Sequence, residues 1–107
     1  ICSSFDVDLA CHNAESPLKT MTNLQLCGGI KNIYIQECFD EFNADWIEDL
    51  FPNYEKVKDG YLSIPDKPGL GITINEDVAK EHPYNKSNFL RMFKPGWENR
   101  KGASESE

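Results

Sequence analysis

Two short segments in the first part of the chain have the residue pattern of β-strands. Between Val7 and Cys11 every second residue is apolar, so one face of this segment is apolar while the other carries Asp8 and His12. Residues 33–37, with the sequence IYIQE, are rich in the β-branched and aromatic side chains that strands favour. We therefore expect two short strands, separated by a longer connecting segment.

The connecting segment has the pattern of one amphipathic helix. Ser16 can cap its start, Pro17 suits its first turn, and Gly28 and Gly29 can end it in a left-handed conformation. Its apolar positions recur at intervals of three, which predicts one buried stripe made of Leu18, Met21, Leu24 and, beyond the helix, Ile30. The order of strand, helix and strand predicts a βαβ unit with parallel strands.

Two chemically active side chains follow the strands of this unit. Because the carboxyl ends of parallel strands share one edge of the sheet, His12 and Glu37 are expected on the same rim, where α/β enzymes collect catalytic groups. An imidazole transfers protons near neutral pH, and a carboxylate can bind a hydroxyl or join the transfer. The alternatives are structural: His12 bonds nearby backbone and Glu37 faces solvent. Asp8 is a further candidate partner for His12.

The chain after Glu37 becomes acidic and aromatic. Residues 46–51 have the spacing of a short helix that Pro52 stops. The acidic residues between Asp40 and Asp49 lack an EF-hand pattern, so we interpret them as an exposed helix face and predict no metal site there. At the end of the sequence, residues 98–107 have the composition of a solvated tail.

Glycine and proline residues dominate the segment from Asp59 to Ile74. Asp59 and Gly60 predict a turn, YLSI (61–64) and ITI (72–74) predict two strands, and PDKPGLG between them predicts a reversal. Asn75 can cap a helix over EDVAKEH, which Pro83 ends.

Composition and charge restrict the partners of the protein. The 107 residues carry a net charge of −7, and the densest basic stretch is interrupted by proline, glycine and glutamate, so we expect no nucleic-acid partner. No apolar run reaches the roughly 20 residues that a membrane helix needs, so we expect no membrane partner. The four cysteines form no CxxC pair and are expected to be buried free thiols of a cytoplasmic protein.

Two stretches of the sequence resemble a known family. DGYLSIPDKPGLGITINEDVAKEHPY (59–84) resembles the C-terminal signature of the acid-sugar dehydratases of the enolase superfamily, especially the mannonate dehydratase-like and starvation-sensing-protein-like group. VDLACHNAESPLKTMTNLQLCGGIKNIYIQE (7–37) resembles the preceding segment, which holds the seventh and eighth barrel strands.

The resemblance implies an α/β fold, the C-terminal part of a (β/α)8 barrel of the mandelate racemase and muconate lactonizing enzyme type. Residues 1–52 would form the last βαβ portion, residues 53–96 the segment that returns to an α+β capping domain, and residues 97–107 a flexible tail. Because the chain opens on Ile1 and a full barrel needs about 250 residues, we expect it to be part of a longer protein. Gly69 and Gly71 would then serve turn geometry.

The resemblance also implies a function, that of an Mg²⁺-dependent lyase that dehydrates a mannonate- or gluconate-like sugar acid through an enediolate. His12 matches the family's residue for proton transfer or substrate binding, and Glu37 its residue that bonds a substrate hydroxyl. The family's metal-binding carboxylates would lie upstream of this chain, so the 107 residues alone are expected to be inactive. Relatives assemble as oligomers, so we expect a homo-oligomer.

Three other functions stay open at this point. The protein could be a catalytically silent relative with a regulatory or binding role, a racemase or epimerase of the same superfamily, or a small interaction domain that has lost its barrel. One departure bears on the choice: many relatives follow the histidine with a Gly-Pro pair, whereas this chain has Asn13 and Ala14. That difference changes the backbone beside the predicted site.

Overall fold

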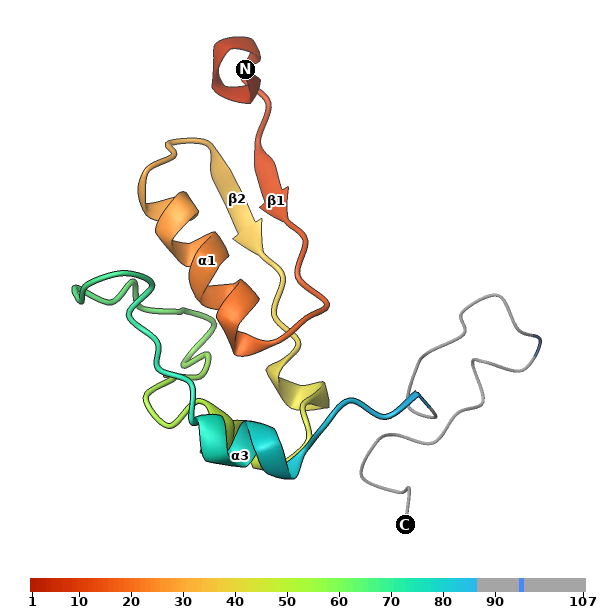
Figure 1. Cartoon of the computed structure of the whole chain (residues 1–107). Helices are drawn as coiled ribbons and strands as arrows, with labels where there is room; N and C mark the ends of the chain where they lie inside the picture. The colour runs from red at the N-terminus through yellow and green to blue at the C-terminus, as the bar shows by residue number, and fades with distance from the viewer. Residues whose placement is uncertain (87–94, 96–107) are drawn as a thin grey trace.

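The computed structural model describes residues 1–86 and residue 95 and contains the predicted βαβ unit. Strands β1 (Leu9–Cys11) and β2 (Ile33–Gln36) pair in parallel, and helix α1 (Pro17–Gly28) connects them. In Figure 1 the two arrows run in the same direction, with α1 along β2. Cys11 is opposite Gln36 in the pairing, so both strands end at the same edge of the sheet. The prediction of parallel strands is confirmed, with β1 shorter than expected.

The two ends of α1 differ from the sequence-based prediction. Ser16 occupies the N-cap position in an extended conformation, but its side chain makes no capping hydrogen bond. Gly29 has φ −97°, so the predicted left-handed end is wrong. Gly28 serves a steric purpose, because a Cβ there would lie 3.1 Å from Cδ1 of Ile64. The glycine lets the return segment pass close to the helix.

Two short helices follow the βαβ unit. Helix α2 (Trp46–Leu50) ends just before Pro52, as predicted, and helix α3 (Glu76–Glu81) begins after Asn75. The Asn75 side chain accepts hydrogen bonds from the backbone N–H groups of residues 77 and 78, which confirms the predicted cap. Single turns of 3-10 helix are present at Cys2–Phe5 (η1) and Asp40–Phe42 (η2).

Helices α2 and α3 contact each other through their ends. The Asn75 N–H donates to the Leu50 carbonyl oxygen at 2.8 Å. The rings of Trp46 and His82 stack with centroids 4.1 Å apart and planes 8° from parallel. This contact gives His82 a structural role.

The part of the return segment that lies between α2 and α3 contains the predicted turn. Asp59 and Gly60 both have positive φ, 51° and 81°, and Lys58 and Tyr61 exchange two backbone hydrogen bonds of 2.9 Å across them. The prediction of two strands at 61–64 and 72–74 is wrong. The backbone pairing that the structure gives for this segment is the isolated Lys58–Tyr61 bridge, which closes the turn.

Side-chain bonds and left-handed glycines shape the remainder of the return segment. Gly69 and Gly71 have φ values of 65° and 71°, which strands do not adopt, and the flanking prolines have no N–H for a ladder. The Asn53 side chain donates to the Gly71 carbonyl oxygen at 3.1 Å and accepts from the Thr73 N–H at 2.8 Å. The architectural role predicted for the two glycines agrees with these angles.

The apolar core of the described residues is small. Met21, Leu24 and Phe51 are its buried members, so α1 contributes two of the residues predicted for its apolar stripe. The four cysteines are free, as predicted, but each is only half-buried. The Sγ atoms of Cys11 and Cys27 lie 3.7 Å apart. The fold thus brings the carboxyl edge of β1 and β2 close to buried polar groups of α1.

Candidate functional site

The side chains of His12 and Glu37 form an ion-pair contact at the carboxyl edge of the sheet. His12 Nδ1 lies 2.7 Å from Oε2 of Glu37. Each residue directly follows its strand, and the parallel pairing brings the two strand ends together. The sequence placed both residues on one rim, and the structure brings them into direct contact. The expected alternative partner, Asp8, is not the residue that this contact uses.

The Glu37 carboxylate is oriented by backbone groups as well as by His12. Its Oε2 atom accepts a hydrogen bond from the Asn13 N–H at 2.6 Å, so the same oxygen makes this bond and the ion-pair contact with His12. The Glu37 N–H donates to the Cys11 carbonyl oxygen at 3.1 Å, which continues the sheet pairing past the strand. The Gln36 side chain also donates to the Glu37 carbonyl oxygen, at 2.6 Å. Both the backbone and the side chain of Glu37 are therefore held.

This arrangement assigns different roles to the two nitrogens of His12. A carboxylate only accepts hydrogen bonds, so the nitrogen that faces it, Nδ1, carries a proton. Nε2 is then the atom that can accept or deliver a proton, as in other carboxylate-oriented histidines. The side chain of His12 is 79% exposed and that of Glu37 38% exposed, so both are accessible to a small molecule. The pair has the geometry for acid/base chemistry.

A second polar cluster lies where the chain leaves the site. The Tyr54 hydroxyl donates to both carboxylate oxygens of Asp40, at 3.0 and 2.8 Å. Burial and the adjacent Asp40 carboxylate raise the pKa of Tyr54 far above its ordinary value, so the phenol stays protonated. Burial also raises the pKa of the neighbouring Cys38 thiol. The sequence analysis missed this cluster because its members are 14 and 16 residues apart.

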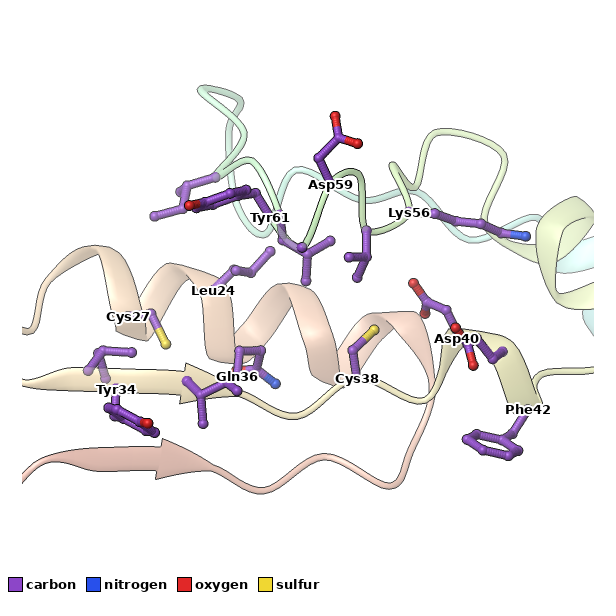
Figure 2. A pocket seen from close by; sticks show the side chains of 17 residues that line it. Leu24, Cys27, Tyr34, Gln36, Cys38, Asp40, Phe42, Lys56, Asp59 and Tyr61 are labelled. Atoms are coloured by element: carbon purple, nitrogen blue, oxygen red, sulfur yellow. The ribbon is translucent and has the colours of Figure 1, made fainter.

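A cleft in the described residues has neither His12 nor Glu37 in its lining. This cleft of about 900 Å³ lies between α1 with β2 and the segment around Tyr61. Figure 2 shows Cys27 on the side of α1 that faces Gln36 and Cys38, and Leu24 on the side that faces Tyr61. The cleft is lined mainly by apolar groups, and its chemistry is that of a packing surface.

Neither a metal centre nor a membrane span is found within residues 1–86 and 95. No group of three or more His, Cys, Asp or Glu side chains is arranged there to hold a metal ion. Nor does any helix in this part of the chain have the length and apolar character required to cross a membrane.

Relatives of known name are similar to this chain in sequence. A D-gluconate/D-galactonate dehydratase of Picrophilus torridus is 33% identical over 97 residues, which is 91% of this chain and 25% of that protein. A D-xylonate dehydratase of Haloferax volcanii is 34% identical over 76 residues, 71% of this chain and 18% of that protein. The chain thus spans about a quarter or less of the length of these relatives.

Solved structures and a family comparison agree with these relatives. A mandelate racemase/muconate lactonizing enzyme from Jannaschia sp. CCS1 superposes with a TM-score of 0.68 at 30% identity, over 78% of this chain and 21% of that one. Residues 1–78 match the family described as "Enolase C-terminal domain-like". The resemblance to enolase-superfamily acid-sugar dehydratases and the α/β fold class are thereby confirmed. The chain belongs to the enolase C-terminal domain-like family.

Proposed function

We propose that this chain is part of an Mg²⁺-dependent lyase that dehydrates a sugar acid of the gluconate or mannonate type, with His12 and Glu37 in its active site. The observation that carries the proposal is the 2.7 Å contact between His12 and Glu37 at the carboxyl edge of two parallel strands. Support comes from relatives whose names describe dehydratases of gluconate, galactonate and xylonate.

The proposed chemistry uses the two nitrogens of His12 differently. Dehydration requires removal of the proton beside the carboxylate of the substrate and departure of a neighbouring hydroxyl as water. His12 moves a proton at Nε2, while Glu37 holds Nδ1 and keeps the imidazole in one orientation. Oε2 of Glu37 already accepts the Asn13 N–H and contacts Nδ1 of His12, so Oε1 is the oxygen that would accept a hydrogen bond from a substrate hydroxyl.

Magnesium enters the proposal through the family alone. The described residues do not form a metal site, so the ligands would come from segments of the protein outside this chain. For this reason we propose that the isolated 107 residues are inactive, and that the active form is the longer protein, as a homo-oligomer in the cytoplasm.

The test uses the full-length protein with Mg²⁺ and a panel of aldonic acids in D₂O, followed by proton NMR. We expect loss of the C2 proton signal together with formation of a 2-keto-3-deoxy acid. His12→Asn and Glu37→Gln should each lower kcat by about 100-fold or more, the usual size of acid/base contributions. His82→Asn is the matched control: it changes a histidine that stacks on Trp46, and activity should stay within about threefold.

Each other result identifies one of the alternatives. Exchange of the C2 proton with deuterium without loss of water would indicate a racemase or epimerase and refute the dehydratase. Absence of both reactions across the panel would indicate a catalytically silent relative. Unchanged kcat in His12→Asn would remove His12 from the mechanism.

A further inference from the structure

Three buried polar side chains converge on the segment that carries His12. Asn13, Thr20 and Asn23 are exposed by only 1%, 1% and 8%, and they are the buried polar residues of the described chain. Burying an amide or hydroxyl is unfavourable unless it is hydrogen-bonded, so the partners of these groups indicate what the burial achieves. We call the three residues the polar clamp.

The contacts of the polar clamp fix the backbone of residues 12 and 13 to α1. The Asn13 Nδ2 atom donates to Oγ1 of Thr20 at 2.7 Å, and the Asn13 Oδ1 atom accepts from the Glu15 N–H at 3.2 Å. One turn further along α1, the Asn23 Nδ2 atom donates to the His12 carbonyl oxygen at 3.3 Å. Two side chains of the helix therefore hold consecutive residues after β1.

The same two residues contact Glu37 from their other side. Oε2 of Glu37 accepts a hydrogen bond from the Asn13 N–H at 2.6 Å and lies 2.7 Å from His12 Nδ1 in the ion-pair contact. The direction of the Asn13 N–H depends on the peptide plane between His12 and Asn13, and the bond from Asn23 to the His12 carbonyl oxygen fixes that same plane. A rotation of this plane would move the Asn13 N–H away from Oε2, and the Glu37 carboxylate that contacts Nδ1 of His12 would lose the hydrogen bond that orients it.

We propose that Asn13, Thr20 and Asn23 are positioning residues, which hold the peptide between His12 and Asn13 so that Glu37 binds Nδ1 of His12 and leaves Nε2 for the substrate. The catalytic part of this proposal, an effect on turnover, rests on the proposed function. The geometric part, the position of the proton on the His12 ring, does not, because it can be measured without any turnover.

The test compares four variants of the full-length protein. Thr20→Val removes the acceptor of the Asn13 amide at nearly constant volume, and Thr20→Ser restores a hydroxyl. Thr22→Val is the matched control, because Thr22 is an exposed residue of the same helix whose hydroxyl donates to the Leu18 carbonyl oxygen at 2.9 Å. Asn13→Ala gives the same test from the other partner should Thr20→Val fail to fold, which far-UV circular dichroism reports.

The first readout is the tautomer of His12, from nitrogen-15 NMR of protein labelled at histidine, recorded at pH 9, where an ordinary imidazole is neutral. The His12 signals are assigned as those lost in His12→Asn. We expect protonation at Nδ1 in the parent protein, Thr20→Ser and Thr22→Val. In Thr20→Val or Asn13→Ala we expect a mixture with Nε2 protonation. Unchanged His12 signals in a folded Thr20→Val or Asn13→Ala variant would overturn the proposal.

The second readout separates positioning from substrate binding. On a substrate identified by the aldonic acid panel, Thr20→Val should lower kcat by about 10- to 100-fold, as expected for a misplaced catalytic group, with KM changed by less than about threefold. Thr20→Ser should recover most of the loss. A rise in KM at constant kcat would overturn the catalytic part. Failure of the whole panel would refute the proposed function and leave the tautomer result standing.

Discussion

Replacement of Gly71 by alanine should destabilise the return segment for two separable reasons. Gly71 has φ 71°, a left-handed conformation that costs an ordinary residue about 1–2 kcal/mol. An added Cβ would also lie 2.5 Å from Cγ and 2.9 Å from Cβ of Pro65, whose ring cannot rotate away. Overpacking of this kind costs about 1–3 kcal/mol. The sum predicts a loss of about 2–5 kcal/mol in the free energy of unfolding.

Gly69 provides the control for this prediction. Its φ of 65° is nearly the same, but a Cβ there would meet nothing within 4 Å, so Gly69→Ala should show the conformational cost alone. Urea unfolding of the full-length protein, followed by circular dichroism, measures both variants against the parent. The difference between them should be about 1–3 kcal/mol, the cost of the contact with Pro65. Equal destabilisation would refute the steric part, and two neutral variants would refute both parts.

Three further predictions concern the core, a helix cap and two thiols. Leu24→Ala should lower the free energy of unfolding by about 2 kcal/mol, at the lower end for such changes because Leu24 borders the open cleft. Leu26 is exposed, so Leu26→Ala should change it by less than about 0.5 kcal/mol in the same urea assay. Asn75→Ala should cost about 1 kcal/mol through loss of the α3 cap, and an unchanged unfolding midpoint would contradict this. Burial raises the pKa of Cys27 and Cys38, so less thiolate is present at pH 7.5. The rate of alkylation of these two thiols by iodoacetamide, measured by peptide mass spectrometry, should therefore be lower than that of N-acetylcysteine and should still increase above pH 9. A rate that reaches a plateau below pH 9 would contradict this.

The βαβ unit could be predicted because its signals are local. Alternation in the first strand, the spacing of Met21 and Leu24, and the β-branched residues after the helix depend only on neighbours in the sequence. Once the strands are parallel, the chain must bring the residues that follow them to one edge. The proximity of His12 and Glu37 follows from that topology, and only the contact itself needed the structure.

The return segment could not be predicted because its backbone bonds go to distant side chains. YLSI and ITI have good strand composition, but strands form only where another strand pairs with them. Here the Asn53 side chain hydrogen-bonds the Gly71 carbonyl oxygen and the Thr73 N–H, about 20 residues away. The left-handed residues Gly69 and Gly71 also turn the chain, so no ladder forms there. Composition predicted the turn correctly and the flanking strands incorrectly for this one reason.

The buried polar residues of α1 were missed for a related reason. Thr20 and Asn23 lie next to the predicted apolar stripe, and a pattern of apolar positions treats a threonine or asparagine there as solvent-facing. Their burial is explained only when their partners, Asn13 and the carbonyl oxygen of His12, are known. The unusual Asn13 after the histidine was noticed in the sequence, but its side-chain partner was not.

The orientation of the candidate pair is a local property of the βαβ unit. Among residues 1–86 and 95, the hydrogen bonds that hold His12 and Glu37 come from residues 11–37: the Cys11 carbonyl oxygen accepts from the Glu37 N–H, the Asn13 N–H donates to Glu37, and the clamp residues of α1 hold the segment of His12. Under the proposed function, the metal contacts and the remaining substrate contacts would require side chains from other segments, because this unit contributes one exposed imidazole and one half-buried carboxylate. If the protein has the proposed function, changes within the unit should alter the rate of proton transfer, while the choice among sugar acids should depend mainly on residues elsewhere in the protein.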